Sequence, residues 1–270
     1  MKRLAAAFAL LLAECAGETT PAPPRESGPT IVSLNPCTDA ILARVAAPEQ
    51  LLAISHYSKD PRASSMSAGE AARFPATGGT VEEVLALDPD VVVASTFIAP
   101  ATQAALEGLG LKVETFGAAA TVDESIAQVR RLAALAGNPG AGERLVAEIE
   151  AAIASLADSG EPVEAVLWQP GGIVPGEAAL VSDLMQRAGF RSYASSRGMA
   201  QADYLSLERI VADPPDVLLV AGEEAGQGHP VLDRLPQMRR EQFDTRLLYC
   251  GGPTIIEAAR RLAQIRGEAG

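Results

Sequence analysis

The stretch "VEEVLALDPDVVVA" at residues 81–94 has the pattern of a helix, a tight turn and a buried strand, and the chain repeats this pattern as "LERIVADPPDVLLV" at residues 207–220. At a constant offset the two copies share a glutamate (Glu82 and Glu208), an alanine, a Pro-Asp pair and a closing aliphatic run. Pro-Asp before aliphatic residues can also arise by chance where a helix feeds a buried strand. Because the register holds without a gap, we instead expect two lobes that are built alike.

Short aliphatic runs alternate with helical patterns along the rest of the chain, which is typical of β-α units and parallel sheets. The expected strands are 30–34, 51–54, 91–94 and 112–115, followed by 163–168, 217–220 and 246–249. Between the two groups lies a helical stretch that "GNPGAG" interrupts at residues 137–142. We therefore predict an α/β fold with an N-terminal lobe at 30–139, an interlobe helix at 140–158 and a C-terminal lobe at 159–270.

The first residues predict export. A basic start is followed by a short apolar run and by small residues around Cys15, so we expect a signal peptide at residues 1–17. "LAEC" resembles a lipobox except at Glu14, which leaves ordinary cleavage and lipidation of Cys15 as alternatives. Residues 18–29 are rich in proline and polar side chains and are expected to be a disordered leader. The expected location is periplasmic, with or without a lipid anchor.

The acidic composition limits the class of partner. The formal net charge is -12 at pH 7, so nucleic acid and anionic membrane surfaces are not expected partners.

The loops directly after the predicted strands indicate where a site would form, because ligands bind beyond the carboxyl ends of the strands in open parallel sheets. These loops contain His56, Cys37 and Cys250, and Trp168 stands at the end of a strand. Two such sets of loops facing each other would form a cleft of mixed aromatic and polar character.

Six stretches carry a resemblance that covers nearly the whole chain beyond the leader. They are "IVSLNPCTDAIL" at 31–42, "SHYSKDP" at 55–61, "TGGTVEEVLALDPDVVVA" at 77–94, "VLWQPGGIVPG" at 166–176, "LERIVADPPDVLLV" at 207–220 and "GGPTIIEAARRLA" at 251–263. Together they resemble the periplasmic substrate-binding proteins of ABC importers that carry cobalamin, ferric siderophores and haem, and the loops match the cobalamin carrier best.

This resemblance implies two Rossmann-like lobes joined by one long helix, which close only slightly on a ligand in the cleft. It implies a monomer that is not an enzyme, with no cofactor besides the metal chelate it carries, which delivers this ligand to an ABC permease dimer with its ATPases. Glu82 and Glu208 match the residues that dock into the permease. The expected ligand-binding residues are Pro36, Cys37, Thr38, His56, Tyr57, Phe97, Trp168, Gln169, Arg197, Glu223, Gly251 and Gly252.

The ligand is left open between a corrinoid and a ferric siderophore, with haem as an alternative. A bare metal ion is a poor candidate because the chain has only two histidines. A negatively charged siderophore would need arginines, and Arg62, Arg191 and Arg197 lie in or near the relevant loops. A corrinoid would need aromatic walls, for which Trp168, Tyr57, Phe97 and Tyr204 are the candidates.

Cys37 and Cys250 depart from the family pattern. They fall on opposite lobes, and three states are open for them: a disulfide, buried free thiols, or direct contact with the ligand or a metal. The rival functions are a Cys37/His56 enzyme, for which no accompanying catalytic motif is seen, and an exported scaffold or chaperone-like protein.

Overall fold

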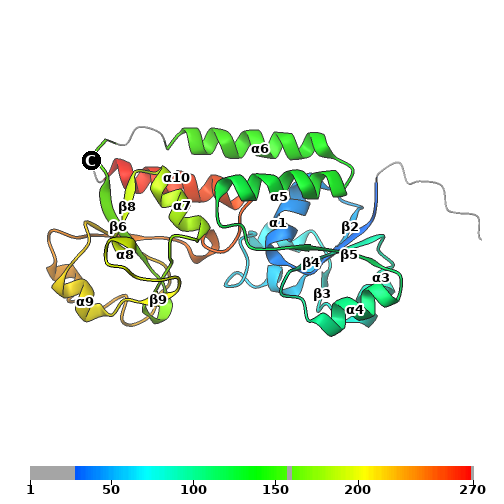
Figure 1. Ribbon diagram of the computed structural model, residues 1–270, viewed down its shortest axis with the longest axis horizontal. Helices are drawn as coiled ribbons and strands as arrows, with labels where there is room; N and C mark the ends of the chain where they lie inside the picture. Colours follow the sequence, from blue (N-terminus) through cyan, green and yellow to red (C-terminus); the bar gives the residue numbers. More distant parts are fainter. Residues whose placement is uncertain (1–27, 157–159, 269–270) are drawn as a thin grey trace, which may run out of the picture.

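Two parallel sheets stand side by side in the computed structural model, which describes residues 28–156 and 160–268 (Figure 1). The first sheet has the order β3-β2-β1-β4-β5 and belongs to the N-terminal lobe. The second has the order β11-β10-β6-β8 and belongs to the C-terminal lobe. The strands of these sheets are β1 (Ile31–Ser33), β2 (Leu51–Ser55), β3 (Ala76–Thr77), β4 (Val91–Ser95), β5 (Lys112–Phe116), β6 (Val163–Trp168), β8 (Phe190–Ser192), β10 (Val217–Val220) and β11 (Arg239–Gln242). A small antiparallel pair, β7 (Ile173–Val174) with β9 (Asp203–Tyr204), follows β6.

Helices connect the strands and cover both sheets. They are α1 (Pro36–Val45), α2 (Ala68–Ala72), α3 (Val81–Leu87), α4 (Pro100–Gly108), α5 (Val122–Leu135), α6 (Pro139–Ala154), α7 (Leu180–Arg187), α8 (Tyr193–Ser196), α9 (Leu207–Ala212) and α10 (Thr254–Gly267). Four short 3₁₀ helices complete the described part: η1 (His56–Lys59), η2 (Pro170–Gly172), η3 (Leu232–Arg234) and η4 (Thr245–Leu247). Within the described ranges, no helix has both the length and the apolar character needed to cross a membrane.

The helical stretch between the two sheets consists of α5 and α6. These helices pack on each other, and α6 also contacts α1 of the N-terminal lobe and α10 of the C-terminal lobe. In Figure 1, α6 runs along the top of the molecule above both. The expected helix boundary at 158, the signal peptide and most of the leader lie outside the described residues, and residues 28 and 29 of the leader have no regular structure.

The repeated sequence forms a helix, a turn and a strand in each lobe, as α3 with β4 and as α9 with β10. The aspartate of each Pro-Asp pair makes the equivalent hydrogen bond in its lobe. Asp90 Oδ2 accepts the backbone N–H of Thr30 beside β1, and Asp216 Oδ2 accepts that of Glu164 in β6. Since β4 pairs with β1 and β10 with β6, each aspartate ties the start of its strand to the neighbouring strand.

The repeated helices also begin alike. Thr80 and Ser206 cap α3 and α9 by accepting the backbone N–H groups of Glu83 and Arg209. The sequence "TVEE" at residues 80–83 has the spacing of a reciprocal capping box. The Glu83 carboxylate accepts hydrogen bonds from the Thr77 hydroxyl and from the backbone N–H groups of Gly78 and Gly79. These hydrogen bonds hold the pKa of Glu83 below its usual value.

One predicted strand is wrong. Residues 246–249 were expected to be extended, but the chain there forms η4, which Asp244 caps by accepting the backbone N–H of Arg246. The strand that completes the sheet is β11, whose sequence "RREQ" has no apolar residue. Because β11 is an edge strand with half-exposed side chains, a hydrophobic pattern could not reveal it. The short strands β3, β7, β8 and β9 were also missed.

The segment "CGGP" before α10 joins the lobes. Cys250 forms a disulfide with Cys37 in the first turn of α1, with a Cα–Cα distance of 4.9 Å, so the alternative of buried free thiols is wrong. The Gly252 N–H donates to Ser125 Oγ of α5 at 2.7 Å. Gly252 has a φ of 61°, and a Cβ atom there would lie 2.4 Å from Ile41 Cγ1. The backbone of the C-terminal lobe therefore packs directly on two N-terminal helices, which only glycine permits.

The double variant Cys37→Ser, Cys250→Ser should unfold more easily than the native protein. The disulfide closes a loop with a sequence separation of 213 residues, and the chain-entropy model assigns such a loop about 5 kcal/mol. We expect a loss of about 2–5 kcal/mol in the free energy of unfolding, measured by urea denaturation under oxidising conditions. Coincident unfolding curves for the two proteins would contradict this stabilising role.

Candidate functional site

The carboxyl ends of the two sheets face each other across a cleft of about 970 Å³. From the N-terminal lobe, Arg62 in the loop after η1 lines it. From the C-terminal lobe, the loops after β6, β10 and β11 contribute Pro170, Gly222, Glu223 and Tyr249, among others. In Figure 1 the loop after β2 projects toward the C-terminal lobe, below the layer formed by α5, α6 and α10. This is the position that parallel α/β lobes give to a ligand site.

Four aromatic side chains stand exposed at these carboxyl ends. Tyr57 on η1 is 56% exposed, and Phe97 after β4 is 86% exposed. Tyr204 on β9 and Tyr249 after η4 are 61% and 53% exposed. Each lobe thus contributes two aromatic groups that are not used in its core, an arrangement suited to a large, flat, partly apolar ligand.

Two of these aromatic groups are positioned by glycine and by a neighbouring ring. The Tyr204 ring lies against Gly172, where a Cβ atom would be 2.5 Å from Cε2 and where φ is 74°. The Tyr57 and His56 rings lie 4.0 Å apart between centroids. Tyr249 was missed because the sequence pattern placed it inside an expected strand at 246–249, whereas it follows η4 in the structure.

The charges of the cleft are largely compensated within the protein. The lining includes the carboxylates of Glu223, Asp244 and Glu257 and the guanidinium groups of Arg62 and Arg261. Arg62 pairs with Asp60 at 3.0 Å, and Arg261 pairs with Glu241 at 2.8 Å. The hydrogen bond from the Arg62 guanidinium lowers the pKa of Asp60. Both cleft arginines therefore already bind carboxylates of the protein itself.

A buried carboxyl group lies beneath the cleft loop of the N-terminal lobe, and sequence reasoning did not single it out. Asp39 in α1 is fully buried, and its Oδ2 accepts hydrogen bonds from Ser55 N at 2.9 Å and Ser58 Oγ at 2.6 Å. Burial raises the pKa of Asp39 to about 7, against the opposing effect of the polar groups of Ser33, Ser58 and Ser55. Aspartate in a first helical turn is common as a capping residue, so the sequence contained no signal for this role.

Several residues expected to bind ligand have structural partners instead. The Trp168 indole is buried in the C-terminal core, and its Nε1 donates to the Leu205 carbonyl at 2.8 Å. Thr38 is buried, and its Oγ1 is hydrogen-bonded to the Asn35 carbonyl and to Ser33 Oγ. Gly251 and Gly252 pack against the N-terminal helices rather than opening into the cleft. Pro36 opens α1 and Gln169 precedes η2, both partly buried. His56 and Glu223 are exposed, and Glu223 lines the cleft.

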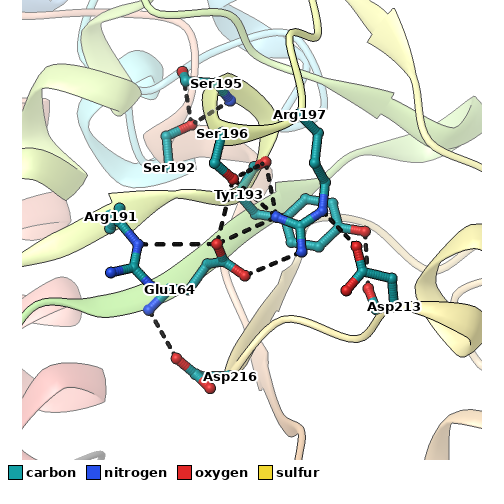
Figure 2. A network of polar contacts seen from close by, with 9 residues as sticks. All are labelled: Glu164, Arg191, Ser192, Tyr193, Ser195, Ser196, Arg197, Asp213 and Asp216. Atoms are coloured by element: carbon teal, nitrogen blue, oxygen red, sulfur yellow. Dashed lines mark hydrogen bonds and ion pairs between the residues drawn. The ribbon is translucent and has the colours of Figure 1, made fainter.

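Arg197 belongs to a polar network at the other end of the C-terminal sheet (Figure 2). Its guanidinium group binds Glu164 at 3.2 Å and Asp213 at 2.7 Å, and it lies 3.4 Å from the Tyr193 ring centroid. Glu164 is near the start of β6, whereas the cleft lies beyond the end of that strand. These contacts raise the pKa of Arg197, with the hydrogen bond to Asp213 the largest cause. Arg197 therefore holds α8 to the sheet, and we leave it out of the ligand site.

Replacing Arg197 by lysine should reduce stability without changing ligand binding. Lysine keeps the charge but cannot make the forked contacts to Glu164 and Asp213 or stack on Tyr193. We expect a loss of about 1–2 kcal/mol in thermal or urea unfolding. Arg191→Lys is the matched control, because Arg191 is 3.9 Å from Glu164 with a side chain 61% exposed. Equal losses in the two variants would contradict the assignment.

Glu82 and Glu208 occupy equivalent places on the two lobes. Each is exposed and is the second residue of its helix, after the capping residues Thr80 and Ser206. In Figure 1, α3 and α9 both lie on the side of the molecule away from α6. The pKa of Glu208 is held below its usual value by hydrogen bonds from its own backbone N–H and from Ser206, so this carboxylate stays charged near neutrality.

A two-lobed α/β protein with a cleft between the carboxyl ends of two parallel sheets has the architecture of an extracytoplasmic binding protein. The chain belongs to the periplasmic binding protein family, whose model matches residues 31–246.

Among curated proteins, the chain is 26% identical over 196 residues to a cobalamin-binding protein of Halobacterium salinarum. The match covers 70% of this chain and 53% of that protein, so the chain spans about half the length of the curated relatives it matches. The name belongs to that protein, and the similarity is one of sequence.

Several solved structures share the fold. The periplasmic vitamin B12-binding protein BtuF of Vibrio cholerae superposes with a TM-score of 0.69 at 18% identity, covering 89% of this chain and 97% of that one. The periplasmic haem-binding protein HutB of Vibrio cholerae gives a TM-score of 0.71 at 17% identity, covering 87% and 98%. The periplasmic haem-binding protein RhuT of Roseiflexus sp. RS-1 gives 0.67 at 22% identity, covering 88% and 99%.

Proposed function

We propose that this protein is the periplasmic substrate-binding component of an ABC importer and that it captures a corrinoid. The observation that carries the proposal is the set of four exposed aromatic groups that follow the carboxyl ends of strands in both lobes, of which Tyr249 lines the cleft. Tyr57 and Phe97 on one side and Tyr204 and Tyr249 on the other could cover the two faces of a flat macrocycle. A volume of about 970 Å³ is at the upper end of the usual range for small-molecule sites and suits a ligand of this size.

The charge of the cleft favours a corrinoid over a negatively charged siderophore. Recognition of an anionic chelate relies on arginines that are available to its carboxylates or catecholates. Here Arg62 and Arg261 pair with Asp60 and Glu241, and three further carboxylates line the cleft. An anionic ligand would have to displace these pairs and approach like charges. The corrinoid ring bears neutral amides, so it would neither have to displace these pairs nor be repelled by the carboxylates.

Haem is the second candidate, for one specific reason. His56 and Tyr57 lie together at the cleft edge, and imidazole and phenolate are both haem-iron ligands. Haem also carries two propionates, which need cationic partners that the cleft arginines would have to provide after leaving Asp60 and Glu241. The corrinoid remains the better fit for this reason.

Calorimetric titration of the purified protein should detect cyanocobalamin binding at micromolar affinity or tighter, a binding free energy of about -8 kcal/mol or more favourable. Haem and a ferric tris-catecholate siderophore, titrated under the same conditions, should bind more weakly. Tyr57→Ala and Tyr249→Ala should each weaken cyanocobalamin binding about tenfold, since stacked aromatic contacts are worth about 1 kcal/mol beyond the area they bury.

Leu109→Ala is the matched control for these variants. Leu109 is 57% exposed, as Tyr57 is, but it follows α4 at the other end of the sheet. Its removal should leave the affinity unchanged. Tighter binding of haem or of the siderophore than of cyanocobalamin would overturn the choice of ligand.

Delivery to the permease is proposed to depend on Glu82 and Glu208. The support is their equivalent placement on exposed helix starts of the two lobes, which matches a pair of basic pockets on a two-fold permease. A charged pair at each lobe would fix the orientation of docking without involving the cleft.

The double variant Glu82→Lys, Glu208→Lys should keep its ligand affinity and lose permease docking. Interface charge pairs that are well desolvated couple by about 1.5 kcal/mol or more, so we expect at least tenfold weaker binding to the permease in nanodiscs and loss of uptake. Glu150→Lys with Glu268→Lys makes the same charge change on α6 and at the end of α10 and should leave docking intact. Full uptake by the first variant would refute the docking role.

A further inference from the structure

The turn that carries His56 and Tyr57 to the cleft is held by one carboxyl group. Ser55 caps η1 and Ser58 lies within it, and both donate to Asp39 Oδ2, through Ser55 N–H and Ser58 Oγ–H. Asp39 itself is fixed in the first turn of α1, two residues after the disulfide cysteine. The exposed side chains of the turn thus sit directly above a buried group that can change its charge.

The second oxygen of this carboxyl group distinguishes it from an ordinary structural aspartate. Asp39 Oδ1 is buried and accepts no hydrogen bond from the residues that the structure describes. An ionised carboxylate has acceptor capacity on both oxygens, and a buried acceptor without a donor is costly. A proton on Oδ1 removes the charge and changes the two bonds to Oδ2 from charge-assisted to weaker neutral hydrogen bonds, which loosens the hold on the turn.

We propose that Asp39 is a positioning residue for the ligand site, which couples the placement of the Tyr57 turn, and hence ligand affinity, to proton binding at a buried carboxyl group. The inference rests on the proposed function in that the ligand covers this turn. It concerns a group beneath the cleft that does not touch the ligand.

The surroundings of Asp39 leave few other titratable groups to account for such coupling. Neither β1 nor β2 contains an ionisable side chain. On the turn itself, Lys59 points to α2, where its Nζ donates to the carbonyls of Ala71 and Phe74. Tyr57 and His56 point outward and are exposed.

Two charged groups near this turn are paired elsewhere. Asp60, which ends η1, binds Arg62. Arg44, the other charged residue of α1, binds Glu148 of α6. His56 lies on the same turn and is therefore tested as the alternative source of a pH effect.

The direction of the pH effect follows from desolvation. A ligand seated on the turn excludes water above Asp39, and further burial disfavours the charged form, so the pKa of Asp39 rises again on binding. Because that pKa is already about 7 in the free protein, binding above pH 7 must take up protons. Affinity is then highest below pH 7 and falls as the pH rises through and above that value.

The test is the affinity for cyanocobalamin between pH 5.5 and 9, a range over which this probe does not titrate. The native protein should bind several-fold more weakly at pH 8.5 than at pH 6, and calorimetry in buffers of different ionisation enthalpy should show proton uptake at pH 7.5. Asp39→Asn has nearly the same shape but no charge, and both effects should disappear. His56→Gln should keep both.

Ser58→Ala provides a second variant that leaves the buried carboxyl group in place. It removes a hydrogen bond that stabilises the charged form, so the decline in affinity should begin at a higher pH. Ser64→Ala is its matched control, because Ser64 is also a buried serine of this lobe but bonds to Met66 N. A flat profile in the native protein, an unchanged onset in Ser58→Ala, or a pH effect that disappears in His56→Gln would overturn the proposal.

A ligand-free measurement separates this inference from the proposed function. Hydrogen exchange of the amides of residues 55–60, corrected for intrinsic rates, should show protection that differs between pH 6 and pH 8.5 in the native protein and not in Asp39→Asn. If cyanocobalamin fails to bind but this difference is found, the corrinoid function fails and the positioning role stands. Equal protection at both pH values refutes the positioning role whatever the protein binds.

Discussion

The contact between "CGGP" and the N-terminal helices is the constraint on which the cleft depends. Two lobes with separate sheets need a fixed relation if loops from both are to form one site. Here the relation is set by the Cys37–Cys250 disulfide, by the Gly252 N–H bond to Ser125, and by the close approach of the Gly252 backbone to Ile41. Tyr249 immediately precedes this junction. Its position relative to the N-terminal loops is therefore set covalently as well as by packing.

The cleft differs from the rest of the protein in its exposed aromatic side chains rather than in its charges. Elsewhere, charged side chains satisfy one another or the backbone, as in the network of Glu164, Arg197 and Asp213. At the cleft, the arginines are paired in the same way, while aromatic side chains are left without a core to pack in. A site of this kind selects its ligand by shape and apolar surface more than by charge, which is consistent with a large, nearly neutral macrocycle.

The duplicated sequence pattern builds the frame of both lobes and leaves their loops to differ. Asp90 and Asp216 tie equivalent strands together, and α3 and α9 begin with equivalent caps and glutamates. After β2, however, the N-terminal lobe places a 3₁₀ turn over the buried Asp39, whereas after β6 the C-terminal lobe forms the β7–β9 pair that supports Tyr204. The frames of the two lobes are therefore alike, whereas the loops after their strands are not.

The sequence by itself determined the α/β class, the paired lobes and the loops that follow the strands. Aliphatic runs and helix signals are local features, and the duplicated segment contains them in each lobe. It also led to His56, Tyr57, Phe97 and Glu223 through their places after strands. Tertiary structure alone decided the rest. The indole of Trp168 turned inward to Leu205, Arg197 found partners at the far edge, and Cys37 met Cys250 across the lobes. The strand "RREQ" formed where "RLLY" was expected. In each case the outcome depends on which residues, distant in the chain, the fold places next to the side chain. No local sequence pattern contains that information.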